Sequence, residues 1–98
     1  MPRVLFTAAA RADLEDALKW YEVRAPEIAP QFREAVRAVV ARIAENPRQF
    51  PSSTHQTRRA LLRRFPYIVI FRAARDTAYV VAVLHASRDP MAWRQRTS

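Results

Sequence analysis

The chain has 98 residues, a length that suits one domain built around one modest hydrophobic core. It contains no cysteine, which excludes disulfide bonds and thiolate metal sites, and no glycine, which excludes the glycine-rich loops that usually hold nucleotide phosphates. The formal net charge of +8 at pH 7 favours an acidic partner, either nucleic acid or an acidic protein segment.

The positive charge is concentrated in the C-terminal half of the chain. Residues 1–46 carry seven basic and seven acidic side chains, whereas residues 47–98 carry ten arginines and only two aspartates. We therefore expect the partner-binding surface on the C-terminal half. No segment approaches transmembrane length, and the N-terminal apolar stretch is too short for a signal peptide. These features predict one soluble domain, residues 1–98, in the cytoplasm and without a membrane partner.

The N-terminal half predicts a short strand followed by two helices. Residues 3–7 are apolar, and Thr7 suits the N-cap of the helix that follows. Apolar side chains then recur at helical spacing at positions 10, 14, 17, 18 and 21. Trp20 lies beside this stripe, where it either packs at the margin or stays partly exposed for a partner, and of the two we expect packing.

A second helix is expected between Pro26 and Asn46. Pro26 suits the first turn, and Pro30 either falls early enough to be tolerated or delays the start. Apolar residues from Phe32 to Ile43 form a wide face, and Asn46-Pro47 ends the pattern. Two amphipathic helices joined by a short connection predict an antiparallel hairpin that covers a sheet.

The C-terminal half predicts three strands after a linker at residues 47–57. Residues 58–64 form the first, with Pro66 marking a bend. Residues 67–72 alternate, and residues 78–84 are apolar throughout, as in a central strand buried on both faces. In the connecting loop, residues 73–76, we expect Asp76 to take any positive φ. A last helical turn is expected at residues 91–96. The predicted class is α+β, in the order β-α-α-β-β-β, with a helical hairpin on a small, mainly antiparallel sheet.

Few residues suggest catalysis or metal binding. His55 and His85 stand thirty positions apart without metal-ligand spacing, so we expect no metal and no cofactor. His85 follows a predicted strand close to Arg88 and Asp89, where a structural role and a role in proton transfer both remain open.

The clearest binding signal is the pair of basic dipeptides Arg58-Arg59 and Arg63-Arg64. They flank one predicted strand, and strand alternation gives either face a basic stripe. Such a strand is often only a solvated, aggregation-resistant surface. The lack of nearby acidic residues favours a binding surface instead. Arg88 stands beside Asp89 and could instead close the loop as an ion pair.

The chain resembles the RelE/ParE superfamily of type II toxins. The resemblance rests on the first helix ending in Trp20-Tyr21, the entry Phe65-Pro66-Tyr67, the strand ending in Leu84-His85-Ala86, and the exit Arg88-Asp89-Pro90. It implies a helical hairpin on a small sheet and a basic toxin that inhibits growth. It also implies a partner, a ParD-like cognate antitoxin encoded next to the toxin.

Two positions favour the ParE-like, plasmid-stabilisation branch, which acts on DNA gyrase, over the RelE-like branch, which cleaves messenger RNA on the ribosome. RelE-like members typically carry an arginine where this chain has Ile68, and a tyrosine where it has Trp93. The alternatives are a ribosome-dependent endoribonuclease and a non-toxic nucleic-acid-binding module. A ribonuclease would use Arg63, Arg64, His85 and Arg88. The expected gyrase-binding residues are Arg59, Arg63, Arg64, Arg88 and Trp93, and the expected antitoxin-binding residues are Trp20, Tyr21 and Arg37.

Overall fold

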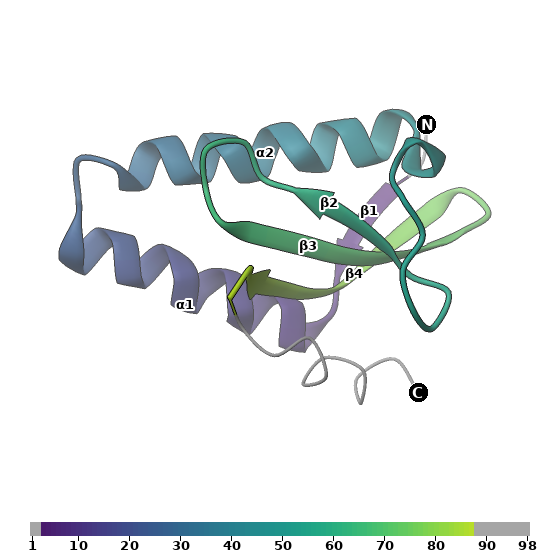
Figure 1. Ribbon diagram of the computed structural model, residues 1–98, viewed down its shortest axis with the longest axis horizontal. Helices are drawn as coiled ribbons and strands as arrows, with labels where there is room; N and C mark the ends of the chain where they lie inside the picture. Colours follow the sequence, from purple (N-terminus) through teal and green to yellow (C-terminus); the bar gives the residue numbers. More distant parts are fainter. Residues whose placement is uncertain (1–2, 88–98) are drawn as a thin grey trace.

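The computed structural model describes residues 3–87 and confirms the predicted element order. Four strands form one sheet in the order β1-β4-β3-β2, in which β1 runs parallel to β4 and the other two pairings are antiparallel (Figure 1). The class α+β and the mainly antiparallel sheet are therefore confirmed. The elements are β1 (Arg3–Phe6), α1 (Ala8–Arg24), α2 (Ala29–Glu45), the short 3-10 helix η1 (Pro47–Gln49), β2 (Arg58–Leu61), β3 (Tyr67–Ala74) and β4 (Thr77–His85). The C-terminal turn expected at residues 91–96 lies outside the described residues.

The ends of both helices follow from local side-chain chemistry. Thr7 caps α1 as predicted, because its Oγ1 accepts a hydrogen bond from the backbone N–H of Ala10 at 3.1 Å. Asn46 ends α2, and its Oδ1 accepts from the N–H of Arg48 at the start of η1. Within residues 3–87, no helix has the length and apolar character needed to cross a membrane.

The start of α2 corrects the expectation for Pro26. The helix begins at Ala29 with Pro30 in its first turn, and residues 26–28 form a turn instead. Pro30 is tolerated because the first N–H groups of a helix have no acceptor within the helix. Both predictions for Pro30 therefore hold: the helix starts later than Pro26, and Pro30 is tolerated in its first turn.

The hairpin between β3 and β4 places its strained residue one position earlier than expected. Arg75 has φ of 52°, whereas Asp76 is not among the residues with positive φ. The carbonyl of Asp76 accepts a hydrogen bond from the N–H of Arg3 at 2.8 Å. Because that bond fixes Asp76 against the start of β1, the left-handed conformation falls on Arg75.

The sheet buries apolar side chains on both faces, and a bulge in β4 shifts its alternation. Ile70 pairs with Ala82 and Phe71 pairs with Val80, so Val81 is an extra residue on β4. As expected for residues 78–84, the middle of β4 is buried on both sides, although Tyr79 is 41% exposed. The face away from the helices carries a separate apolar cluster, which consists of Ile68, Ile70, Val81, Ala82 and Leu84.

An aromatic cluster joins the helical hairpin to the other face of the sheet. Phe32 of α2 is fully buried, and its ring lies 4.9 Å from that of Tyr21 and 5.3 Å from those of Phe65 and Tyr67. Of the two expectations for Trp20, partial exposure is the one that holds, because Trp20 is 49% exposed, with its ring edge-on to that of Tyr21 at 5.1 Å. Tyr21 takes the inward position, and successive helical residues point about 100° apart, so Trp20 is directed away from the core.

Candidate binding surfaces

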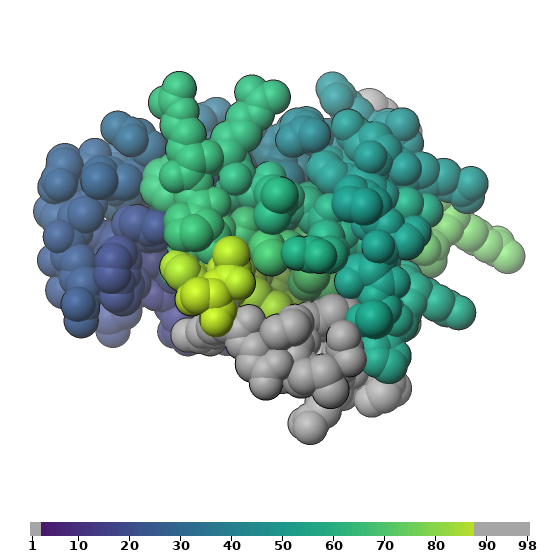
Figure 2. Space-filling view, viewed as in Figure 1, coloured from purple at the N-terminus to yellow at the C-terminus, as the bar shows by residue number. Residues whose placement is uncertain are grey.

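The basic bend between β2 and β3 holds two of the predicted target-binding residues. The predicted strand at residues 58–64 ends at Leu61, so Arg63 and Arg64 lie in the bend and not on a strand face. Arg64 has φ of 69°, and a residue in that left-handed conformation cannot continue a strand. Both arginines are exposed, and Figure 2 shows long side chains of this bend projecting outward. Arg59 is exposed on β2 itself.

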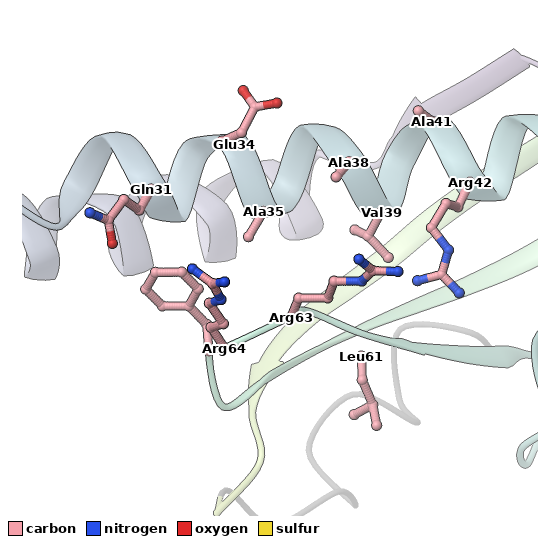
Figure 3. A pocket seen from close by; sticks show the side chains of 11 residues that line it. Gln31, Glu34, Ala35, Ala38, Val39, Ala41, Arg42, Leu61, Arg63 and Arg64 are labelled. Carbon is pink, nitrogen blue, oxygen red and sulfur yellow. The ribbon is translucent and has the colours of Figure 1, made fainter.

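Arg63 and Arg64 line a groove between α2 and the bend, which we call the arginine groove (Figure 3). It has a volume of about 550 Å³. Small and apolar side chains form its floor, and Arg42 of α2 completes its basic rim. Figure 3 shows Arg63 extending below Val39 toward Arg42. The lining residues are Gln31, Glu34, Ala35, Ala38, Val39, Ala41, Arg42, Leu61, Arg63, Arg64 and Phe65.

A second groove, the hairpin groove, runs between α1 and α2. It has a volume of about 300 Å³ and a mainly apolar lining with arginines at its edge. The edge carries both charges, because Arg33 pairs with Glu22 at 2.6 Å and Arg37 pairs with Glu34 at 3.3 Å. The lining residues are Phe6, Leu14, Leu18, Phe32, Arg33, Val36, Arg37 and Val40.

A third, aromatic hollow lies where α1 meets the ends of β3 and β4. Its lining consists of Trp20, Tyr21, Tyr67, His85 and Ser87, around a volume of about 330 Å³. His85 lies edge-on to Tyr67, with 5.2 Å between ring centroids, and its Nδ1 accepts from the backbone N–H of Ser87 at 3.2 Å. Burial raises the pKa of the Tyr21 phenol, so that phenol stays neutral near pH 7.

The structure separates residues that the sequence assigned to one surface. Of the three predicted antitoxin-binding residues, Arg37 lines the hairpin groove, whereas Trp20 and Tyr21 line the aromatic hollow. His85 likewise lines a different hollow from Arg63 and Arg64. Arg88 and Trp93 lie outside the described residues.

Sequence reasoning did not include Arg42 among the candidate binding residues. The available signal was the run of small residues at positions 35, 38 and 41, because small side chains on one helical stripe leave room for a groove beside them.

Ile68 occupies an apolar environment. It packs against the cluster of Ile70, Val81, Ala82 and Leu84 on the sheet face away from the helices. Its partners on the neighbouring strands are Leu61 and Leu84, and Arg59 lies opposite Ile70, so the position at which RelE-like toxins typically carry an arginine is here part of an apolar cluster.

Comparison with known proteins agrees with the fold described above. A solved structure described as the chromosomal ParDE toxin-antitoxin system from P. aeruginosa matches 89% of this chain and 98% of its own, with 23% identity and a TM-score of 0.76. At that identity the match supports the fold. Among the curated proteins, none matches the sequence. The family model for the ParE toxin of the type II toxin-antitoxin system parDE matches residues 4–90. The chain therefore belongs to the ParE toxin family.

Proposed function

We propose that this ParE-family toxin arrests growth in the cytoplasm by inhibiting DNA gyrase, and that a ParD-like antitoxin keeps it inactive. The observation that carries the choice of target is the apolar setting of Ile68. Cleavage of RNA requires groups that stabilise charge on a phosphate in the transition state. Ile68 supplies no such group, and its partners on the neighbouring strands are Leu61 and Leu84, which supports inhibition by binding rather than by catalysis.

The arrangement of the other polar candidates supports the same choice. A general base and a phosphate-stabilising cation must reach the same reacting atoms within hydrogen-bonding distance. His85 is directed into the aromatic hollow and is held by Ser87, whereas Arg63 and Arg64 line the arginine groove. We propose Arg59, Arg63 and Arg64, together with Arg88 and Trp93, as the surface that binds gyrase.

The hairpin groove suits a helix of the antitoxin. An amphipathic helix binds by placing its apolar side in a hydrophobic groove. The lining offers Leu14, Leu18 and Val40 for such contacts, and the ion pairs of Arg33 with Glu22 and of Arg37 with Glu34 give the groove a polar edge. Trp20 is exposed and close to α1's C-terminal end, where a longer antitoxin segment would reach it.

Growth assays test the toxin-antitoxin proposal. Expression of the chain alone is expected to stop growth and to reduce the negative supercoiling of a reporter plasmid, measured by gel electrophoresis. Co-expression of the neighbouring reading frame should restore both. A chain that is equally harmless with and without that frame would contradict the proposal.

A further inference from the structure

We propose that the arginine groove binds an extended segment of the target protein that carries acidic and apolar side chains, and that this segment hydrogen-bonds to the open end of the β2 edge at Leu61. The inference rests on the proposed function, because it takes gyrase as the target. It adds a binding mode and a chemical class of ligand to the arginines already assigned to that surface.

The rim of the groove carries three arginines that suit a negatively charged ligand, and Arg42 among them also lies over the Phe50 ring at 5.1 Å. Arg42 from α2 and Arg63 from the bend are directed toward each other (Figure 3), and Arg64 lines the same groove. Among residues 3–87, no carboxylate pairs with any of these three arginines. Glu34, the acidic residue in the lining, pairs with Arg37. Guanidinium groups bind carboxylates through two parallel hydrogen bonds, so acidic side chains of a partner would satisfy this rim.

The floor of the groove favours a polypeptide over a nucleic acid. Ala35, Ala38, Val39 and Phe65 present an apolar surface between the charged groups. A DNA duplex would leave that surface without a partner, since its outer strands present polar sugars and phosphates while its bases are stacked inside. A peptide that alternates acidic and apolar residues matches both the rim and the floor.

The end of β2 offers a main-chain hydrogen-bond donor beside the groove. Residues 51 and 52 pair with the outer edge of β2 at Arg58 and Arg59, and the N–H of Arg59 points away from β3, because it donates to the carbonyl of Pro51 at 3.1 Å. Residues two apart in a strand point the same way, so the N–H of Leu61 also points outward. Within the part of the chain that the structure describes, that N–H has no acceptor. An extended partner segment can pair with such an edge.

The position of the groove favours the target over the antitoxin as the source of the segment. The hairpin groove and the arginine groove lie along opposite sides of α2, since their linings share no residue. A helix in the hairpin groove would leave the arginine groove open.

Binding of the purified full-length toxin to purified DNA gyrase tests the inference, with Arg63→Glu, Arg64→Glu and Leu61→Pro as variants. Each charge reversal is expected to raise the dissociation constant roughly 10- to 100-fold, the effect of losing a charge-assisted hydrogen bond. Leu61→Pro removes the outward N–H, which an edge strand tolerates, and should weaken binding about tenfold more than Leu61→Ala.

Controls separate this inference from its alternatives. Arg11→Glu reverses a charge on an exposed part of α1 outside all three surfaces and should bind gyrase like the wild type. If a rim variant fails to fold, Ala38→Glu replaces it in the binding experiment. Ala38 is an exposed residue of α2 that lines the groove, and the carboxylate of the introduced glutamate would offset positive charge at the rim. Antitoxin binding by the rim variants should change less than about twofold.

The outcomes are distinct. Failure of the wild type to bind gyrase would overturn the proposed function and this inference together. Wild-type binding with unchanged affinity in the rim variants would overturn the inference alone. If the rim variants lost binding to the antitoxin or to duplex DNA but kept gyrase binding, the groove would belong to a different partner. That result would also overturn the inference.

Discussion

Phe32→Ala is expected to lower the free energy of unfolding by about 3–5 kcal/mol, the usual cost of truncating a fully buried phenylalanine. The ring of Phe32 contacts Tyr21, Phe65 and Tyr67, so its loss leaves a cavity where the helical hairpin meets the sheet. Chemical denaturation measures the change. For a domain of this size the thermal midpoint should fall by more than about 12 °C.

Val23→Ala is the matched control for Phe32→Ala. Val23 is 72% exposed, so removing its methyl groups should change stability by less than about 0.5 kcal/mol. A loss below about 1 kcal/mol in Phe32→Ala would show that the aromatic cluster does not hold the hairpin to the sheet.

Val40→Asp is expected to weaken antitoxin binding more than about 100-fold. Val40 is partly buried in the hairpin groove, and a helix bound there would cover the new carboxylate, while the arginines of the lining, Arg33 and Arg37, are already paired with Glu22 and Glu34. Burial of an unpaired charge costs several kcal/mol, and each 1.4 kcal/mol corresponds to about tenfold in affinity. The measurement is the dissociation constant of the purified toxin and antitoxin.

Ala12→Asp serves as its control, because it places the same carboxylate on an exposed position of α1 outside the groove. Ala12→Asp should bind antitoxin like the wild type. Equal affinity for antitoxin in Val40→Asp and the wild type, with unchanged thermal midpoints, would place the antitoxin elsewhere on the toxin.

Much of the fold could be predicted because local signals agreed with tertiary contacts. Thr7 and Asn46 mark helix ends through side-chain hydrogen bonds to nearby backbone, which the sequence alone can indicate. The uniformly apolar run before His85 predicted a strand buried on both faces, and β4 lies between β1 and β3. These features depend on short-range chemistry or on composition.

The errors arise where a distant contact decides between local options. Asp76 was expected to take the positive φ. Its carbonyl instead accepts a hydrogen bond from the N–H of Arg3, and Arg75 is the residue of this turn that has a positive φ. Trp20 and Tyr21 are both large and aromatic, and only the presence of Phe32, Phe65 and Tyr67 on one side determines that Tyr21 turns inward.

The candidate site was predictable only in part, for a similar reason. The excess of arginine in the C-terminal half indicated a basic surface, and Arg63 and Arg64 do lie exposed in one bend. The groove itself requires α2 to lie beside that bend, so Arg42 joins them only in three dimensions. The bulge at Val81 also escaped prediction, because apolar residues surround it on both sides in the sequence.

The assignment of the target is tested most directly with purified protein on two substrates. One reaction measures supercoiling of relaxed plasmid by DNA gyrase, and the other measures cleavage of messenger RNA on ribosomes. The apolar setting of Ile68 and the separation of His85 from the arginines predict inhibition of supercoiling with intact messenger RNA. Cleavage of messenger RNA on ribosomes together with normal supercoiling would contradict the account and assign the chain to the ribonuclease branch.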